Sequence, residues 1–273
     1  MSFQIILAKP RVNGSKIYLT SRKERSGREI RRKALEISET SLWRLSLRAP
    51  FTLWAVGMTH STFAILLGGN LTVTDRLKKA LADSRFIAAD SGMRHAAILG
   101  VEPELWVGDF DSTDAELARQ WPGIKQKTYP PEKNETDGEI ATAEAVDRGA
   151  TRLVFVGALG GERSDHALQH LLHAMSLAER GVDIVLTSGE EEAVPLLPGR
   201  ISLDLPKGSL FSVIGFSALE GLDIIGARYP LVNFSLPFGS SRTVSNVAEG
   251  RVEFHLRSGK GMILARPYDM TGA

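Results

Sequence analysis

The sequence predicts an α/β protein in which a doubly wound parallel sheet domain is followed by a small all-β sandwich domain. Two observations predict this fold class. Short apolar runs alternate with segments of helical period from residue 63 to about residue 186. After Glu190–Glu192 the helical period stops, and Gly, Pro and Ser separate short apolar runs up to the chain end. We therefore expect three regions, at residues 1–57, 58–190 and 191–273.

Each strand expected in the α/β region is an apolar run that ends in a turn residue. Phe63–Leu67 is unbroken and apolar, as parallel strands covered on both faces are, and Gly68-Gly69 follows it. The next expected strands are 86–89, 105–107, 125–129, 153–156 and 183–186. Helices are expected at 74–82, before Gly100, from Thr113, at 136–149 and at 165–180. Strands of the all-β region are expected at 210–214, 222–225, 251–256 and 262–265.

Composition limits the classes of protein and of site. The chain has 273 residues, of which 43% are hydrophobic, so it can bury a core. It has no cysteine, which excludes disulfide scaffolds and thiolate metal sites and fits a reducing cytosol. No apolar run approaches the roughly 18 residues that cross a bilayer. These features predict a cytoplasmic protein that does not bind membranes.

Charge divides unevenly along the chain. Residues 1–57 carry 12 Lys/Arg and 4 Asp/Glu, whereas the remainder carries 21 and 28. The basic stretch Ser21–Lys33 fits a nucleic-acid arm, an organelle-targeting leader or a poorly ordered extension. We favour the extension, and Met58 just before the first strand is a candidate translation start. An acidic body binds nucleic acid poorly, so we expect no nucleic-acid partner.

Acidic residues gather where the expected strands end. Asp90 follows the second strand, Asp109 and Asp111 follow the third, and Asp137 and Asp165 open the helices after the fourth and fifth. The carboxyl ends of parallel strands share one edge of a sheet, where these carboxylates would repel one another without a cation. Mg²⁺ prefers such oxygens and takes further ligands from phosphates. Neither a Walker sequence nor a GxGxxG after the first strand is present.

A set of motifs in fixed order resembles the thiamine pyrophosphokinase family. The order is GG, ADSG (89–92), GDFDS (108–112), KNETD (133–137), GALGGERSDH (157–166) and Ser245-Asn246, and the resemblance covers about residues 63–266. It implies that ATP donates its terminal pyrophosphoryl group to the hydroxyl of thiamine, which leaves AMP and thiamine diphosphate.

The same resemblance implies roles for particular residues. Asp109, Asp111 and Asp137 would bind Mg²⁺, while Asp90, Arg163 and Asp165 would line the cleft for ATP and thiamine. Ser245 and Asn246 would contact the pyrimidine ring across a homodimer interface. Further nucleotide-binding residues would be Gly69, Ser112, Lys133, Thr136 and His166.

The chemistry of pyrophosphoryl transfer supports these roles but leaves the role of Asp165 open. Attack by a hydroxyl on the β-phosphorus places charge on phosphate oxygens, which Mg²⁺ and Arg163 would stabilise. Asp165 would either accept the hydroxyl proton or orient the alcohol. Three positions depart from the family pattern, namely Asn134, Gly138 and the additional Glu162. They leave the expected ligands in place and affect the geometry of the loops.

Other functions remain as alternatives. One is a pyrophosphokinase of the same fold that acts on another alcohol, such as a pterin, against which Ser245-Asn246 argues. Another is a non-catalytic nucleotide-binding module or a nucleic-acid binder with a basic arm. His166, His170 and His173 have spacings that zinc sites use, but the apolar opposite face explains this helix without a metal.

Overall fold

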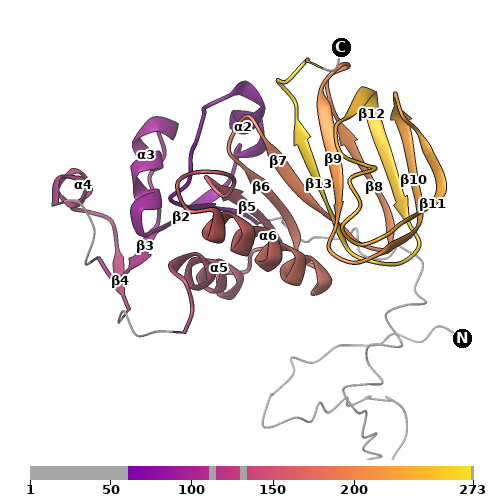
Figure 1. Cartoon of the computed structure of the whole chain (residues 1–273). Coiled ribbons are helices and arrows are strands. Elements are labelled where there is room, and N and C mark those ends of the chain that lie inside the picture. Colours follow the sequence, from indigo (N-terminus) through magenta and orange to yellow (C-terminus); the bar gives the residue numbers. More distant parts are fainter. Residues whose placement is uncertain (1–60, 111–114, 130–133, 272–273) are drawn as a thin grey trace, which may run out of the picture. The chain divides into compact units, whose positions relative to one another are not determined.

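The computed structural model describes residues 61–110, 115–129 and 134–271. The expected extension 1–57 and the residues Asp111, Ser112, Thr113 and Lys133 therefore lie outside the described part. In the first half of the described chain the helices are α2 (Asp75–Ala80), α3 (Arg94–Leu99), α4 (Ala115–Gln120), α5 (Asp137–Asp147) and α6 (Ser164–Glu179), and a 3₁₀ turn η2 spans Asp90–Met93 (Figure 1). The strands there are β1 (Thr62–Leu66), β2 (Arg85–Ala89), β3 (Leu105–Gly108), β4 (Gln126–Thr128), β5 (Arg152–Val156) and β6 (Asp183–Thr187).

These six strands form a parallel sheet in the order β6-β5-β1-β2-β3-β4. Helices cover both of its faces. On one face α5 and α6 pack against side chains such as Phe63, Ile65 and Phe155. On the other face α2 and α3 pack against the alternate side chains, which include Leu66 and Trp106. The expected doubly wound α/β architecture is confirmed.

Helix α5 shows how local sequence sets an element's start. The Thr136 side chain accepts a hydrogen bond from the Glu139 N–H, and a Glu139 carboxylate oxygen accepts one from the Thr136 N–H at 2.9 Å. This capping box, expected from the spacing, satisfies two donors that a helix start leaves unpaired. It also fixes the direction of the first turn, in which Asp137 lies.

Antiparallel strands follow the parallel ones. They are β7 (Glu192–Leu196), β8 (Gly199–Asp204), β9 (Leu210–Gly215), β10 (Leu219–Ala227), β11 (Leu231–Leu236), β12 (Asn246–Leu256) and β13 (Gly261–Arg266). The first residues of β12 pair with β9, and the rest of the strand pairs with β10 and β8. Between these layers lies a second core, where the rings of Phe211 and Phe254 meet edge to face at 5.6 Å. The expected all-β part is thus present, with β7, β8 and β11 in addition to the strands expected.

The α/β part and the β part are joined by backbone pairing and by one partly buried ion pair. β7 pairs antiparallel with β6 and with β13, so the sheet continues from one part into the other. Arg76 of α2 binds Glu192 of β7 through two hydrogen bonds of 2.6 and 2.9 Å and donates a third to the Asp204 carbonyl oxygen. Because both side chains are less than one third exposed, this pair is held more firmly than a surface ion pair.

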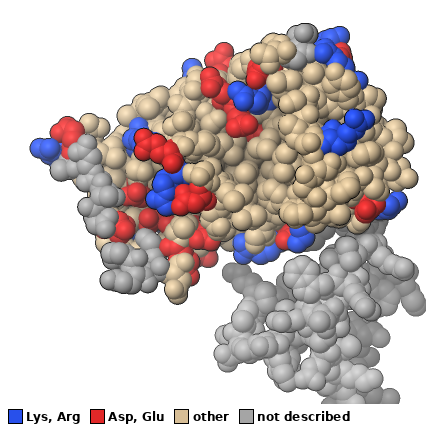
Figure 2. Space-filling view, viewed as in Figure 1, with Lys and Arg blue, Asp and Glu red and all other residues tan. Residues whose placement is uncertain are grey.

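The surface of the described residues is mixed in charge. Figure 2 shows acidic and basic side chains next to one another across the α/β part of the face in view. The ion pairs of the described residues include Arg163 with Asp165 and Arg85 with Glu104. None of the described helices is both long and apolar enough to cross a membrane.

Candidate functional site

The largest cavity described lies at the point where the winding direction of the sheet reverses. Strand β1 is central and pairs with β2 on one side and β5 on the other. The chain leaves β1 toward α2 on one face and leaves β5 toward α6 on the opposite face. Loops that diverge in this way open a crevice beyond the carboxyl ends of the strands, and ligands of α/β proteins bind in such crevices.

This cleft has a volume of about 650 Å³ and is lined mostly by polar and glycine residues. The expected site residues that line it are Gly69, Asp90, Thr136, Asp137, Arg163 and His166. They come from four separate segments of the chain, which the fold brings together. Residues not expected from the sequence also line it, among them Asn70, Ser91 and Arg94. Their position just after Gly69 and Asp90 at two strand ends is the signal that would have identified them.

Asp109 and Asp165 stand next to the cleft rather than in its lining. Gly108, at the end of β3, lies against Asp90, since a Cβ atom built on Gly108 would be 3.5 Å from the Asp90 Cα. Asp109 comes directly after Gly108 in the chain and is therefore close to Asp90, which lines the cleft. Asp111, Ser112 and Lys133, also expected here, lie outside the described residues.

Arg163 and Asp165 form an exposed, two-bonded ion pair at the start of α6. The Arg163 Nε and terminal nitrogen donate to the two Asp165 oxygens at 2.9 and 2.7 Å. This guanidinium holds the pKa of Asp165 well below its usual range. A carboxylate held in this way is a weak base, so the geometry favours an orienting role for Asp165 over proton removal.

The carboxylate side of the cleft fits a cation. Asp90 has one buried carboxylate oxygen, Oδ1, that has no hydrogen-bond partner among the described residues, and its backbone φ of 45° is unusual for a residue other than glycine. A buried, unpaired carboxylate oxygen is costly unless a positive group approaches it. Within residues 61–110, 115–129 and 134–271 no three His, Asp or Glu side chains are already arranged as a metal site. One of the three expected ligands, Asp111, lies outside these ranges.

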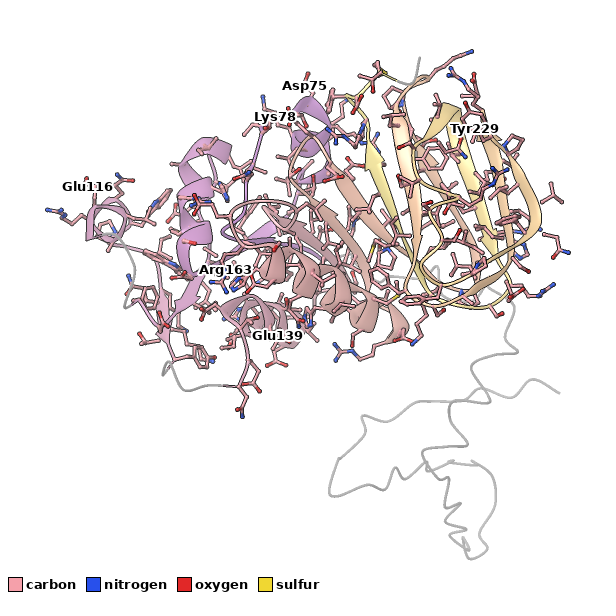
Figure 3. The ribbon with its side chains drawn as sticks, in the orientation of Figure 1. Asp75, Lys78, Glu116, Glu139, Arg163 and Tyr229 are labelled. Carbon is pink, nitrogen blue, oxygen red and sulfur yellow. The ribbon has the colours of Figure 1, made fainter. Side chains whose placement is uncertain are left out.

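Ser245 and Asn246 lie in a different cavity, within the β part. This second cavity has a volume of about 460 Å³ and includes Arg228, Tyr229 and Arg242 in its lining. Figure 3 shows Arg163 at the start of α6 and Tyr229 in the β part, well apart in the same chain. No residue of the described chain lines both cavities.

Asn246 uses its side chain to hold the backbone of this second cavity. Its Oδ1 accepts hydrogen bonds from the Tyr229 N–H at 3.1 Å and the Val247 N–H at 2.8 Å, and its Nδ2 donates to the Tyr229 carbonyl at 2.8 Å. Asn246 is 5% exposed, whereas Tyr229 is 61% exposed. The Tyr229 ring and the Ser245 hydroxyl are therefore more available to a ligand than the Asn246 amide is.

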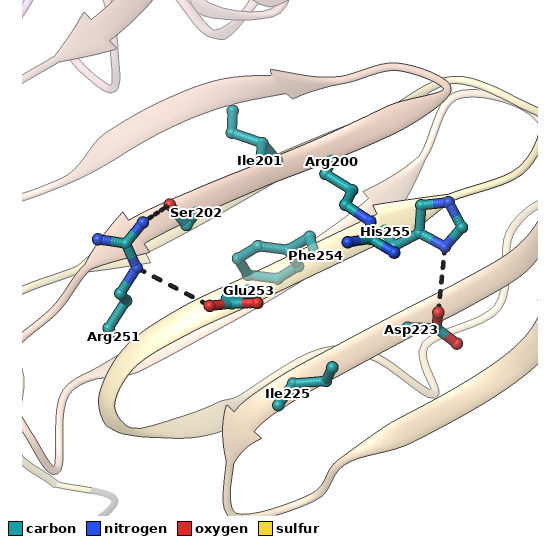
Figure 4. A pocket seen from close by; sticks show the side chains of 9 residues that line it. All are labelled: Arg200, Ile201, Ser202, Asp223, Ile225, Arg251, Glu253, Phe254 and His255. Atoms are coloured by element: carbon teal, nitrogen blue, oxygen red, sulfur yellow. Dashed lines mark hydrogen bonds and ion pairs between the residues drawn. The ribbon is translucent and has the colours of Figure 1, made fainter.

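A third hollow, of about 310 Å³, lies on the outer face of β8, β12 and β10 and contains none of the expected residues (Figure 4). Its polar side chains already bind one another. His255 lies 3.1 Å from Asp223, and Arg251 donates to Ser202 at 2.7 Å. This pattern is that of the solvated face of an antiparallel sheet.

Comparisons with known proteins agree with the architecture. Residues 77–186 match the family model described as "Thiamin pyrophosphokinase, catalytic domain", and residues 200–261 match "Thiamin pyrophosphokinase, vitamin B1 binding domain". Comparison with curated proteins gives no match.

Solved structures are similar over most of the described chain. The thiamin pyrophosphokinase of Geobacillus thermodenitrificans is 26% identical, with a TM-score of 0.66, and the match covers 78% of this chain and 100% of that one. The Bacillus subtilis thiamine pyrophosphokinase is 23% identical, with a TM-score of 0.68 and coverage of 76% and 99%. The Candida albicans thiamin pyrophosphokinase is 13% identical, with a TM-score of 0.61 and coverage of 75% and 90%. The last two likenesses show the fold alone.

Two family models thus match consecutive parts of one chain, and together they span more than half of it. The first falls on the parallel sheet with its cleft, and the second falls on the antiparallel part with the Ser245 cavity. The chain belongs to the thiamine pyrophosphokinase family.

Proposed function

We propose that this protein transfers the terminal pyrophosphoryl group of ATP to the hydroxyl of thiamine, which yields thiamine diphosphate and AMP. The observation that carries the proposal is the cleft at the carboxyl ends of β1, β2 and β5. It places glycine backbone, carboxylates and Arg163 around one cavity large enough for a nucleotide. The chain also matches both a catalytic and a vitamin B1 binding family domain, so it has a separate part for each of the two substrates.

ATP would bind with its phosphates against the glycine loops. A Cβ on Gly69 would lie 2.4 Å from the Gly157 carbonyl oxygen, so glycine at this position lets the loops after β1 and β5 pack together at the wall of the cleft. Asp109, Asp111 and Asp137 would hold Mg²⁺, with the unpaired Asp90 oxygen nearby. A bound Mg²⁺ neutralises phosphate charge and polarises the phosphoryl oxygens. Ser112, Lys133, Thr136 and His166 complete the proposed nucleotide contacts.

The residues of the cleft would act mainly by position and charge. The thiamine hydroxyl oxygen would attack the β-phosphorus and release its proton to solvent, while the bond from that phosphorus to the α-phosphate oxygen breaks and AMP leaves with that oxygen. Arg163 would stabilise the charge that develops on the phosphate oxygens, with Asp165 holding its guanidinium in place. Little covalent chemistry is required of the protein.

Thiamine would be held by the Ser245 cavity of a second copy of the chain in a homodimer. Supporting this, Ser245 and Asn246 lie in a cavity separate from the cleft of their own chain. Asn246 would fix the Tyr229 backbone, and the exposed Tyr229 ring would offer a flat surface to the heteroaromatic rings of thiamine.

We place the reaction in the cytoplasm, without nucleic-acid or membrane partners, and we propose residues 58–190 as the catalytic region and 191–273 as the thiamine-binding region. Both matched ranges, 77–186 and 200–261, fall within these bounds. Residues 1–57 would be an extension that the reaction does not need. No observation on the described residues favours a pterin acceptor or a non-catalytic module.

The test is release of AMP from ATP and Mg²⁺ by the purified full chain. We expect AMP and thiamine diphosphate in equal amounts with thiamine, and only background AMP without an acceptor or with a pterin alcohol. The Asp137→Asn variant should remain folded and lose most of the turnover, because it removes a proposed ligand charge. Absence of thiamine-dependent AMP in the wild type would refute the proposal.

A further inference from the structure

The loop after β1 is pinned on two sides. On the β5 side, the Leu67 N–H donates to the Val156 carbonyl at 2.8 Å and the Gly69 N–H donates to the Gly157 carbonyl at 2.9 Å. On the α3 side, the carbonyls of this loop accept side-chain donors. His95 Nε2 lies 2.9 Å from the Gly69 oxygen, and Arg94 donates to the oxygens of Gly68 and Gly69. The orientation of the Gly69–Asn70 peptide is therefore set by side chains of α3.

His95 is a neutral, buried donor. It is 3% exposed, and its Nδ1 has no hydrogen-bond partner within the part of the chain that the structure describes. A carbonyl oxygen only accepts hydrogen bonds, so the proton is on Nε2 and Nδ1 carries a lone pair. Burial also lowers the pKa of the His95 side chain. This histidine thus holds the backbone of the loop after β1, at Gly69 and more weakly at Leu67, rather than taking part in a proton-transfer step.

Fixing that carbonyl also fixes the neighbouring N–H. The peptide bonds of the described chain are trans, so the Gly69 C=O and the Asn70 N–H point in opposite directions. With the oxygen held toward His95, the Asn70 N–H is directed away from it. Asn70 is exposed and lines the cleft, and its N–H has no hydrogen-bond partner among residues 61–110, 115–129 and 134–271.

We propose that His95 is a positioning residue that turns the Asn70 backbone N–H into the cleft as a donor to a phosphate oxygen of ATP. This inference rests on the proposed function, because ATP supplies the anion. Gly161 lies on the opposite side of the same space, where a Cβ would be 3.7 Å from the Asn70 nitrogen and 3.3 Å from the Gly69 Cα. The absence of that side chain leaves room for the anion to reach the N–H.

Two amide variants that differ by one methylene test this. In His95→Gln the side-chain NH₂ reaches the position of Nε2 and can still donate to Gly69, whereas in His95→Asn it is too short. We expect His95→Asn to weaken the binding of Mg²⁺·ATP about tenfold, as loss of one well-placed hydrogen bond to a charged group does. His95→Gln should stay within about threefold of the wild type. The measurement is calorimetric titration with Mg²⁺·ATP in the absence of thiamine.

A second readout and a control separate positioning from simple loss of structure. In turnover, the KM for ATP should rise in His95→Asn while the KM for thiamine stays unchanged. His173→Asn is the matched control, because His173 also has a buried, unpartnered nitrogen but, among the described residues, makes no hydrogen bond to the loop after β1 as His95 does. It should bind ATP as the wild type does. If His95→Asn does not fold, His95→Leu, which has no donor, replaces it.

Equal ATP affinity of the Asn and Gln variants, whether unchanged or weakened, would overturn the role of His95. Loss of affinity in the His173 control as large as in His95→Asn would also overturn it. A wild-type protein that does not bind Mg²⁺·ATP at all would instead refute the proposed function, and this inference with it. A wild type that binds ATP while both His95 variants bind equally well leaves the proposed function standing.

Discussion

Asp90 combines two unfavourable features that a structural residue would avoid. Its backbone has a φ of 45°, and its Oδ1 is buried without a partner among the described residues. Trp106 holds this conformation by donating its indole N–H to the Asp90 carbonyl at 2.9 Å. Such strain persists where the surrounding structure enforces it, and it is common at functional sites. We therefore propose that the carboxylate serves a ligand rather than the fold.

The Asp90→Asn variant should separate these two roles. Asn adopts the left-handed conformation as readily as Asp, and it removes the buried charge. We expect a melting temperature equal to or above that of the wild type, together with AMP formation reduced at least about a hundredfold, as loss of charge at a phosphoryl-transfer site causes. Thermal unfolding and the AMP assay measure the two effects. Wild-type turnover in this variant would remove Asp90 from the site.

At the same scale, the sequence predicts which residues approach the cleft better than it predicts what they do. Asp90 and Asp137 are identified because each stands at a strand end or helix start, and a parallel sheet brings such positions together. The pairing of Arg163 with Asp165 depends on side-chain rotamers, which no spacing reveals. Likewise, only the coordinates show that the Asn246 amide binds the Tyr229 backbone.

At the scale of elements, a strong local sequence signal is sufficient to predict a helix or a strand, whereas a weak one is not. The Thr136–Glu139 capping box and the apolar run of β1 identify their elements without tertiary information. β7 contains Pro195, which cannot donate to a ladder and which argues against a strand when the sequence is considered alone. In the structure β7 pairs with both β6 and β13, so tertiary pairing overrides the local signal.

Helix α6 carries a pH dependence that can be tested. Burial lowers the pKa of His170 and of His173, whose ring stacks on Phe155, below the ordinary value of 6.5. On acidification the unfolded chain therefore takes up protons on these two histidines that the folded chain does not. The contribution of the neutral histidines to the free energy of unfolding is fully present above pH 6.5. It is lost as the pH falls from 6.5 toward the lower folded pKa.

We expect the free energy of unfolding to fall less steeply with acidification in His173→Leu than in the wild type. The difference between the two proteins should be no more than about 1.4 kcal/mol between pH 6.5 and 5.5, the limit for one titrating group. Urea unfolding at both pH values measures it. The Asp183→Asn variant, in the exposed pair with Arg152, serves as the control and should keep the wild-type slope in this range. If the free energy of unfolding of His173→Leu and of the wild type changed equally between the two pH values, His173 would not be the group responsible for the pH dependence.

At the scale of the whole molecule, the continuous sheet and the Arg76–Glu192 pair hold the α/β part and the β part together as one body. The proposed nucleotide cleft and the Ser245 cavity therefore stay apart within a chain, and we propose that a complete site requires a second copy. A homodimer with twofold symmetry would form two such sites, each with a cleft from one chain and a thiamine cavity from the other.

Mixing two inactive variants tests this arrangement. Asp137→Asn damages only the cleft, and Tyr229→Ala damages only the thiamine cavity. The assay uses a thiamine concentration at which the Tyr229→Ala protein alone shows no turnover. In a mixed dimer, one site combines both damaged halves and the other combines both intact halves, so random assembly of equal amounts should restore about one quarter of the wild-type sites. Coexpression followed by the AMP assay measures the recovery. Asp137→Asn mixed with Asp90→Asn, both in the cleft, should recover nothing. If the first mixture also stays inactive although the chains exchange, each active site is built within a single chain and the shared site is refuted.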